Sequence, residues 1–532
     1  MANTAHHTDV LIVGLGPTGA TLASLLAQAG VRVAVFDKLD DLYPLPRAIG
    51  LDHEALRIWQ GLGLADALAP HLAAYRPSEY RGTQGQLIKR LDMAPPPHRL
   101  GWAPNWVFNQ PAVERVLRQH LATLPGVHLA TGHEVLQCDE ADDHVTASVR
   151  DAQGQVQHWT ARLVVACDGG ASPIRKRLDI TLDDLQFDEP WLVVDAHVQP
   201  AKLAELPQTQ VQYCEPQRPS TYVVGPGNHR RWELMLLPGE ALHEHWPEDQ
   251  LWPLLARWIQ PGEAQIWRAA AYRFHGLVAQ RWRAGRVLLA GDAAHMTPPF
   301  MAQGMVQGLR DAANLAWKLA RVLRHGAPHA LLDSYEAERK PHVIATTQAA
   351  IALGRVICER DAQAAQARDE RLLAECGGVV PTTIRQSMLP GLSAGLLAAG
   401  SPGAGTLFPQ PRVHSAARPG LQLLDDLGAA NVCVLVREAA LGAGDAARLQ
   451  QALLPLQGQL LRLAAADAAT PDNSLPGVRI HEEATLMADW LASLGAAIAI
   501  VRPDRQVYAT AQDVPQALAH LHTLTLALTE AA

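Results

Sequence analysis

The sequence predicts an α/β protein that combines a Rossmann-like nucleotide-binding domain, an inserted and mainly antiparallel sheet, and a third α/β domain. Three observations lead to this prediction. A glycine-rich turn with G-x-G-x-x-G spacing follows the first apolar strand. Two later apolar strands end in Asp168-Gly169 and in Gly291-Asp292. Residues 185–275 alternate polar and apolar positions between turn residues, as strands with one covered face do.

The first strand and its turn are the most informative part of the chain. Residues 10–13 are apolar and β-branched, which predicts a buried parallel strand. In the turn that follows, Gly14 lets the backbone bend sharply and Gly16 admits a pyrophosphate. Gly19 lets the next helix pack closely against the strand.

The elements after this turn complete the nucleotide-binding pattern. Residues 20–29 predict a helix whose free N–H groups point at the phosphate. Residues 31–36 predict a second strand that ends at Asp37, where the pattern places an acid for a ribose hydroxyl. The alternative is a plain glycine turn between core elements, but the order of strand, turn, helix, strand and acid favours a dinucleotide site.

The next segments supply two further candidate contacts. Residues 42–50 predict a Pro-rich loop in which Arg47 either reaches a bound phosphate or is a solvated loop residue. Pro111 suits the first turn of a helix at 112–124. Gln110, just before it, is either a cofactor contact or part of an ordinary helix start.

Two more strands end in turns that carry acids. A strand at 161–166 runs into residues 167–175, where an acid, two glycines, a hydroxyl and an arginine predict a phosphate-facing turn. A strand at 287–290 ends in Gly291-Asp292. A loop at 298–305 then leads into a long helix at 308–325, whose N-terminus stabilises nearby negative charge.

The second half of the chain carries less chemistry. A further helical run covers 330–360, and the Ala-, Gly- and Pro-rich residues 361–410 predict a loosely packed connector. Beyond residue 420 the sequence predicts strands at 432–436, 478–480 and 497–501 and helices at 484–494 and 514–528. Cys433 stands alone in this region, so disulfide exchange is not expected there.

Composition excludes several function classes. The chain has 532 residues and a net charge of −8, which argues against nucleic-acid binding and against a basic membrane anchor. The six cysteines form no C-x-x-C pair or zinc-spaced cluster, so we expect reduced thiols in a cytoplasmic protein and no metal site. No apolar run is long enough to predict a membrane span.

Together, the three turns resemble those of the single-component FAD-dependent aromatic hydroxylases, the group A flavoprotein monooxygenases. The resemblance covers residues 1 to about 350. Residues 45–50, 231–233 and 308–318 look most like the 3-(3-hydroxyphenyl)propionate hydroxylase group. The tail, with Val-Arg-Pro-Asp at 501–504, is similar to the thioredoxin-like C-terminal domain of the phenol hydroxylase branch, which typically lacks a redox cysteine pair.

This resemblance implies a division of the chain into domains. The FAD-binding domain would comprise residues 1–75, 105–182 and 276–360, the substrate-binding domain 76–104 and 183–275, the connector 361–410 and the thioredoxin-like domain 411–532. It also implies FAD as cofactor, NADH or NADPH as reductant, O₂ as co-substrate and a small aromatic substrate. Whether the chain forms a homodimer is left open.

The resemblance further assigns roles in holding FAD. The implied cofactor contacts are Gly14, Gly16, Pro17, Thr18, Gly19, Asp37, Lys38, Arg47, Gln110, Asp168, Gly169, Asp292, Pro299, Gly304 and Met305. Pro298 and Pro299 would lie beside the reacting edge of the flavin. Gly304 and Met305 would present N–H groups to its pyrimidine end. Many relatives have Gly where this chain has Ala302, so a left-handed backbone there would be strained.

The implied reaction is hydroxylation of a phenol ortho or para to its hydroxyl through a flavin C4a-hydroperoxide, with phenylpropanoid acids as the expected substrates. Nitrophenol, quinolone or polyketide aromatics are alternatives for the same flavin chemistry. A halogenase is disfavoured because the chain has no W-x-W-x-I-P segment. A non-catalytic FAD-binding protein is the alternative from another class.

Candidate substrate residues lie in or beside the inserted sheet. A substrate carboxylate needs a cation, and Arg218, Arg230, Arg231 and Arg273 are candidates, although each is also typical of a protein surface. Strand alternation puts His275 on one face with Arg273. With an ordinary pKa of about 6.5, His275 is a candidate to accept the phenol proton. A structural histidine is the alternative, and Tyr213 and Tyr222 are rivals for the role.

Overall fold

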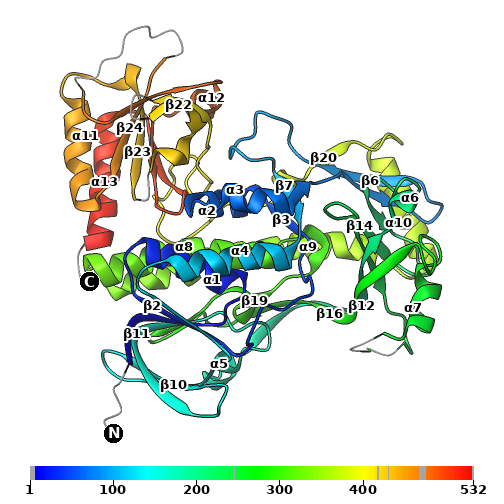
Figure 1. The fold of residues 1–532 in the computed structure, drawn as a ribbon. Coiled ribbons are helices and arrows are strands. Elements are labelled where there is room, and N and C mark those ends of the chain that lie inside the picture. Colours follow the sequence, from blue (N-terminus) through cyan, green and yellow to red (C-terminus); the bar gives the residue numbers. More distant parts are fainter. Residues whose placement is uncertain are drawn as a thin grey trace.

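The computed structural model describes residues 6–240, 243, 246–415, 418–428, 431–465 and 475–529. Figure 1 shows three parts: a nucleotide-binding domain with both termini beside it, an elongated sheet domain, and a C-terminal domain packed above the helices of the first. Among the described residues, no helix is both long enough and apolar enough to cross a bilayer.

The nucleotide-binding domain is built on a sheet whose central strands are parallel, as the sequence predicted. The strand order is β17-β18-β11-β1-β2-β8, and β9 and β10 extend the sheet next to β11. The strands are β1 (His6–Val13), β2 (Val33–Asp37), β8 (Val127–Thr131), β9 (Glu134–Glu140), β10 (Val145–Arg150), β11 (Val156–Ala166), β17 (Arg283–Ala284) and β18 (Val287–Leu289). Val10, Leu11 and Ile12 are fully buried because helices cover the middle of this sheet.

Helices of this domain connect the sheet to the rest of the molecule. They are α1 (Pro17–Gln28), α2 (His53–Gly61), α3 (Ala65–Leu68), α4 (Gln110–Thr123), α5 (Pro173–Arg177), α8 (Gly304–His325) and α9 (Asp333–Ile357). A small sheet of β3 (Gly50–Asp52), β7 (Asn105–Phe108) and β4 (Leu72–Ala74) lies beside α2. Figure 1 shows α1, α4 and α8 running side by side over the sheet.

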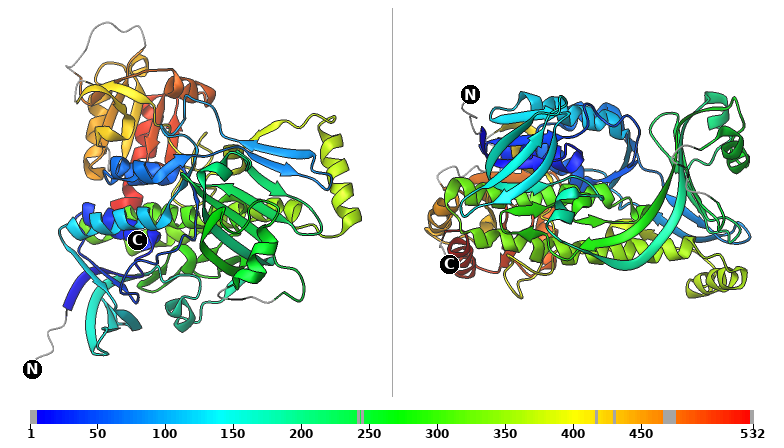
Figure 2. Two further views of the ribbon diagram at one scale, coloured as in Figure 1. Left: turned by 45° about the vertical axis from the view of Figure 1, so that its right-hand side comes forward. Right: turned by 90° about the horizontal axis from the view of Figure 1, so that it is seen from below.

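The inserted domain is a nine-stranded, mainly antiparallel sheet in the order β19-β16-β12-β15-β14-β13-β5-β6-β20. Its strands are β5 (Ser78–Arg81), β6 (Leu87–Asp92), β12 (Leu182–Val198), β13 (Gln210–Tyr213), β14 (Ser220–Val224), β15 (His229–Met235), β16 (Ala264–Ala279), β19 (His295–Met296) and β20 (Thr382–Ile384). The short helix α6 (Pro200–Leu203) follows β12. The long strands β12 and β16 pair over most of their length and reach from the nucleotide-binding domain into this domain (Figure 2).

The two faces of this sheet have different partners. Trp232 and Leu234 on one face form an apolar cluster with Leu251 and Leu255 of α7 (Glu248–Leu255). On the other face, Asp195 and its cross-strand neighbour Arg231 are buried against the loop at residues 46–47. The second face therefore looks toward the nucleotide-binding domain.

The prediction of a loose connector at 361–410 is wrong for much of that segment. It contains helix α10 (Ala362–Glu375) and strand β20, which extends the inserted sheet by pairing with β6. Asp361 caps the helix by accepting a hydrogen bond from Ala364 N at 2.8 Å. The buried guanidinium of Arg368 donates to the carbonyls of Cys214 and Val356, both at 2.8 Å. A helix that is held by hydrogen bonds of this kind need not show the regular spacing of apolar residues that predicts a helix. The Ala-rich composition also made this helix hard to recognise.

The C-terminal domain has a seven-stranded sheet in the order β22-β21-β25-β24-β23-β26-β27. Its elements are β21 (Arg412–Ser415), β22 (Arg418–Leu423), β23 (Cys433–Arg437), α11 (Asp445–Leu453), β24 (Gln459–Leu463), β25 (Val478–Glu482), α12 (Leu486–Ser493), β26 (Ile498–Val501), β27 (Val507–Ala511) and α13 (Val514–Thr529). The predicted third α/β domain is thus confirmed. Cys433 is buried, and burial raises the pKa of its thiol to about 12.

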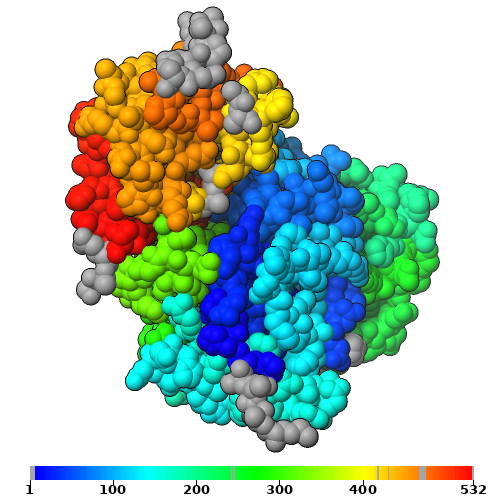
Figure 3. All heavy atoms as spheres, turned by 60° about the vertical axis from the view of Figure 1, so that its left-hand side comes forward, coloured from blue at the N-terminus to red at the C-terminus, as the bar shows by residue number. Residues whose placement is uncertain are grey.

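Buried ion pairs fasten this domain to the rest of the chain, and Figure 3 shows the two surfaces in direct contact. Arg57 of α2 pairs with Asp425 at 2.8 Å. Arg502, in the Val-Arg-Pro-Asp stretch, pairs with Glu338 of α9 at 2.7 Å. Lys318 of α8 pairs with the same Glu338 oxygen at 2.8 Å. Helix α8 also packs against the Gly291-Asp292 turn.

Candidate active site

The three turns predicted from the sequence meet at the carboxyl ends of the parallel strands. Gly14 has φ +102°, and a Cβ there would collide with the carbonyl of Cys167, so the first and second turns touch. Gly291 has φ +62°, and its Cβ would lie 2.8 Å from Thr18 Oγ1, so the first and third turns also touch. The structure therefore brings all three motifs into one site.

Gly16 and Gly19 are glycines for different reasons. A Cβ on Gly19 would collide with the carbonyl of Gly14, because α1 packs directly on the turn. A Cβ on Gly16 would meet nothing within 4 Å. Gly16 is also the N-cap of α1 and offers no side-chain cap, which leaves the helix N-terminus open to a ligand. This cradle fits a pyrophosphate on the helix dipole.

Asp37 lies at the end of β2, where the sequence placed it. Its carboxylate accepts hydrogen bonds from Leu15 N at 2.7 Å and Leu39 N at 2.9 Å. Each oxygen keeps a lone pair for a ribose hydroxyl. Lys38, the next residue, is exposed. Arg47 is also exposed, and its guanidinium lies 5.6 Å from the centre of the Tyr43 ring.

Gln110 is buried, and protein groups occupy its amide. Its Oε1 accepts from the backbone N–H groups of Arg47 and Ala48, and its Nε2 donates to Glu114 at 2.6 Å. Gln110 therefore fixes the loop that carries Arg47. The two alternatives left open by the sequence missed this role, because the contact joins residues 62 and 63 positions apart.

Asp168 and Asp292 both have carboxylate oxygens that protein groups leave free. Asp168 Oδ2 accepts from Ile174 N at 3.2 Å, whereas Oδ1 is buried without a partner. Asp292 is exposed and accepts no hydrogen bond from any described residue. Desolvation by the surrounding protein raises the pKa of both carboxyls. Both acids fit the hydroxyls of a dinucleotide.

Within the turn at 167–175, which the sequence predicts to face a phosphate, Ser172 and Arg175 contact protein groups instead. Ser172 Oγ caps α5 by accepting from Arg175 N at 3.0 Å. The buried Arg175 guanidinium donates to the carbonyls of Gly170 at 2.8 Å and Ala293 at 2.9 Å. Arg175 therefore ties the second turn to the third.

Asp311 of α8 is a functional residue that the sequence analysis missed. It is fully buried and accepts from Gly291 N at 3.0 Å, His295 Nε2 at 2.6 Å and Arg339 Nε at 2.9 Å. Burial alone would raise its pKa, but His295 and Arg339 lower it. Asp311 thus holds the Gly291-Asp292 turn in place. The sequence carries little signal for it, because Asp311 lies on the polar face of the helix with Asn314 and Lys318, a face that the structure also buries.

The loop at 298–305 leads into α8 as expected. Pro298 is buried, Pro299 is half-buried, and α8 begins at Gly304. Gln303 precedes the helix without capping it through its side chain, so Gly304 and Met305 present N–H groups. This is the arrangement expected at the pyrimidine end of a flavin.

Aromatic residues line the sheet behind this loop. Phe300 packs against Trp191 and Phe274 with ring centres 5.9 and 6.1 Å apart. His275 and Arg273 point to the opposite side of β16, where both contact the exposed Asp188, at 3.3 and 2.6 Å. The predicted sharing of a face by Arg273 and His275 is confirmed. This face is turned away from Phe300 and the proline loop, which favours a structural role for His275.

The tyrosines proposed as rivals also lie on the far face. Tyr213 and Tyr222 belong to the apolar cluster under α7. The Tyr213 hydroxyl accepts from Trp258 Nε1 at 3.1 Å. Burial raises the pKa of Tyr222 to about 12. The structure therefore places both tyrosines on the face of the sheet opposite Asp195 and Arg231.

Each candidate arginine already has a protein partner. Arg218 pairs with Glu240 at 2.7 Å, and Arg230 donates to backbone carbonyls, including that of Gly227 at 2.9 Å. Arg273 pairs with Asp188, as described above. Arg231 pairs with Asp195 at 2.8 Å.

The Asp195–Arg231 pair is the anchor between the two domains. Arg231 and Arg268 both donate to the carbonyl of Pro46, and Arg231 Nη1 donates to Arg47 O at 2.9 Å. His229 Nε2 lies 2.7 Å from Asp195 Oδ1. Burial alone would raise the pKa of Asp195, but Arg231 and His229 lower it to about 2. These side chains hold the loop at residues 46–47 against the inserted sheet.

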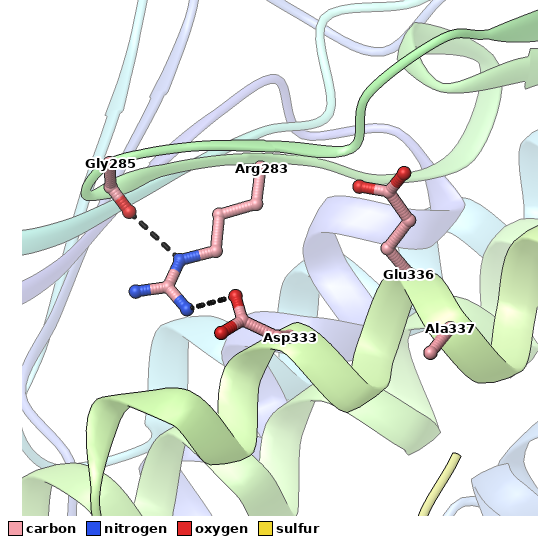
Figure 4. Close-up of a pocket in the computed structure, with 5 residues that line it drawn as sticks. All are labelled: Arg283, Gly285, Asp333, Glu336 and Ala337. Carbon is pink, nitrogen blue, oxygen red and sulfur yellow. Dashed lines mark hydrogen bonds and ion pairs between the residues drawn. The ribbon is translucent and has the colours of Figure 1, made fainter.

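A separate surface pocket of about 520 Å³ lies where α9 begins. Figure 4 shows Arg283 reaching between the turn and the helix, where it donates to Gly285 O at 2.9 Å and pairs with Asp333 at 2.6 Å. Glu336 and Ala337 complete the lining. None of the predicted site residues lines this pocket, and its cation is already paired.

The family model described as "FAD binding domain" matches residues 7–350, and the one described as "HcaD C-terminal domain" matches residues 405–524. The first match covers all three turns. The chain belongs to the FAD-binding monooxygenase family.

Curated relatives of this FAD-dependent aromatic monooxygenase align over nearly its whole length. It is 36% identical to a "Probable NADH-specific resorcinol 4-hydroxylase" of Rhodococcus jostii, over 96% of this chain and 93% of the relative. It is 34% identical to a 3-(3-hydroxy-phenyl)propionate/3-hydroxycinnamic acid hydroxylase of Burkholderia cenocepacia, over 96% and 94% of the two chains.

Solved structures show the same monooxygenase fold at lower identity. The flavin-dependent monooxygenase PieE, in complex with FAD and substrate, aligns with a TM-score of 0.78 at 20% identity, over 98% of this chain and 99% of PieE. Aklavinone-11 hydroxylase, in complex with FAD and aklavinone, gives a TM-score of 0.78 at 21% identity, over 99% of both chains.

Proposed function

We propose that the protein uses NADH to hydroxylate a phenol ortho or para to its hydroxyl group. The observation that carries this proposal is the set of open groups on one side of the three turns: the cradle at Gly16, the unpartnered Asp292 carboxylate and the uncapped start of α8. Their chemistry fits the pyrophosphate, the hydroxyls and the electron-rich ring of FAD. NADH rather than NADPH is supported by the name of the resorcinol hydroxylase.

The substrate we propose is a phenol with a second group in the meta position. Both curated relatives are named for such a ring: resorcinol carries a second hydroxyl, and 3-(3-hydroxyphenyl)propionate carries a propionate. Phenylpropanoid acids are the class expected from sequence. The pairing of all four candidate arginines favours the neutral, resorcinol-like member, because a substrate carboxylate would find each of these cations engaged.

When bound, FAD supplies hydride acceptance from the nicotinamide and the activation of O₂. The chain supplies position and environment. The N–H groups of Gly304 and Met305 stabilise negative charge at the pyrimidine end of the ring. The rings of Trp191, Phe274 and Phe300 exclude water from the adjacent face of the site.

We also propose that the C-terminal domain is thioredoxin-like and structural. Parallel strands β23, β24 and β25 with antiparallel β26 and β27, flanked by α11 and α13, support this assignment. Its one cysteine, Cys433, is buried and has no second cysteine for exchange. Assembly is the alternative role.

Flavin binding and substrate-stimulated NADH oxidation test the proposed function together. The purified protein should be yellow and should release free FAD in acid. Phenols with a meta substituent should stimulate NADH oxidation and yield a dihydroxylated or trihydroxylated ring. A protein that gains no flavin spectrum with added FAD contradicts the site, and one that binds FAD but consumes no NADH with any phenol supports the non-catalytic alternative. Nitrophenols, quinolones and polyketide aromatics complete the screen.

A further inference from the structure

Glu233, two residues after Arg231 on β15, lies beside the loop that faces the flavin. Arg231 Nη1 is 2.9 Å from Arg47 O and 3.8 Å from Glu233 Oε1. One guanidinium nitrogen therefore touches the flavin-side loop and approaches the Glu233 carboxylate. Glu233 also shares its face of the sheet with Asp195, so it points toward the nucleotide-binding domain.

The Glu233 carboxylate receives no hydrogen bond from the described residues. Its cross-strand neighbours are Val193, which is apolar, and Thr221, whose hydroxyl donates to Gln212 Oε1 at 2.6 Å. Its nearest cation, Arg231, donates to Asp195 and to loop carbonyls instead. Burying a carboxylate without a hydrogen-bond donor costs free energy, so we expect a bound ligand to supply the donor.

The Glu233 carboxylate is buried but not completely closed off. The Glu233 side chain keeps 8% of its surface accessible, although the surrounding protein encloses it. Burial raises the pKa of its carboxyl, Asp195 acts in the same direction, and Arg231 and Arg268 oppose it. Trp191 and Phe274, which pack behind the proline loop, project from the same face of the sheet.

We propose that Glu233 is a substrate-recognition residue that accepts a hydrogen bond from a hydroxyl group of the aromatic ring. This inference rests on the proposed function and specifies which chain atom selects the substrate. A ring hydroxyl would satisfy the Glu233 carboxylate, whereas a substrate carboxylate has no proton to donate and would place a second negative charge beside it. Glu233 therefore favours rings that carry hydroxyl groups over rings that carry acids.

Substrate binding to the FAD-loaded enzyme tests this role apart from turnover. The Kd is read from the change in flavin absorbance as resorcinol, 3-(3-hydroxyphenyl)propionate or 3-methoxyphenol is added. We expect Glu233→Leu to raise the Kd of resorcinol roughly 10- to 100-fold, since a hydrogen bond to a charged group is lost. The Kd of 3-methoxyphenol, which has one hydroxyl fewer, should rise less. KM should follow Kd, with a smaller change in kcat.

Two further variants keep the test decisive. Glu233→Gln has the same shape and keeps a neutral acceptor, so it should raise the resorcinol Kd by roughly threefold or more, because charge-assisted bonds are stronger. It decides the question if Glu233→Leu does not fold. Asp183→Asn, an exposed carboxylate on β12, is the matched control and should leave all three constants unchanged.

The outcomes separate this inference from the proposed function. Wild-type Kd values for resorcinol in both Glu233 variants, with normal FAD content, would show that Glu233 is structural and overturn the inference. If wild-type enzyme gives no absorbance change and no NADH oxidation with any of the phenols, the proposed function itself fails.

Discussion

Gly50 leaves the space that the side chain of Ala302 needs. A Cβ on Gly50 would lie 2.8 Å from the Cβ of Ala302, well inside van der Waals contact. Ala302 has φ +51°, the left-handed conformation that the sequence analysis recognised as a risk at this position. The loop that leads into α8 therefore keeps its left-handed turn despite the Cβ, with a glycine on the facing strand β3.

This relationship predicts the effect of exchanging the two side chains. Gly50→Ala should lower the free energy of unfolding by roughly 1–3 kcal/mol, because two Cβ atoms would overlap in a packed region. Ala302→Gly should be near neutral alone, since relief of strain offsets the greater freedom of the unfolded chain. The double variant should recover most of the loss, measured by urea unfolding. Additive effects of the two changes would contradict the predicted contact.

Gly16 and Gly19 should respond differently to a side chain. Gly16→Val should leave the protein folded, because a Cβ there meets nothing within 4 Å, but should block the pyrophosphate cradle and abolish FAD retention. Gly19→Ala should reduce folded yield, because its Cβ would collide with the carbonyl of Gly14. Circular dichroism measures whether each variant is folded, and the flavin content of the purified protein measures whether it retains FAD. Normal flavin content in Gly16→Val would remove the cradle from the site.

Asp292→Ala should weaken FAD retention strongly while leaving the thermal stability of the flavin-free protein unchanged. The reason is that no described residue donates a hydrogen bond to this carboxylate, so its removal breaks no internal contact. Asp311→Ala is the contrasting variant: it leaves His295 and Arg339 unpaired and should cost roughly 3–5 kcal/mol of stability. Flavin occupancy after gel filtration is the measurement. Full occupancy in Asp292→Ala would show that the acid only completes its turn.

The attachment of the C-terminal domain should be sensitive to acid. Burial alone would raise both pKa values, but arginine and lysine partners lower the pKa of Glu338 and of Asp425 to about 2, from ordinary values of 4.5 and 3.8. Each group contributes stability that is present above its ordinary pKa and is lost as pH falls toward 2. Arg57→Met should raise the pH at which the protein unfolds in acid, because Asp425 loses an arginine partner. The exposed pair Arg371–Glu375 provides the control: Arg371→Met should leave the transition in place.

His275→Gln should leave the coupling of NADH oxidation to product unchanged. His275 contacts the exposed Asp188 on the face of β16 that is turned away from Phe300. Measuring H₂O₂ together with the hydroxylated product distinguishes a structural His275 from a catalytic base. Normal flavin reduction with slowed hydroxylation and raised H₂O₂ would instead restore His275 as the base suggested by the sequence.

Local sequence patterns are sufficient to predict the nucleotide-binding half. The glycines at 14, 16 and 19, Asp37 and Asp292 follow strands directly, so local spacing fixes where they lie. It also identified the antiparallel insertion, because alternation records which face of a strand is covered. These features depend on neighbours in the chain, and a single sequence contains them.

Which charged groups are free to bind a ligand depends on contacts between distant parts of the chain. Arg231 is a candidate cation in the sequence, but Asp195, 36 positions away, takes up its guanidinium. Arg175, Gln110 and Asp311 likewise serve carbonyls and N–H groups of distant loops. Glu233 is left without a donor for the same reason. The partners of a buried polar group are set by packing between elements, and no local pattern of residues records them.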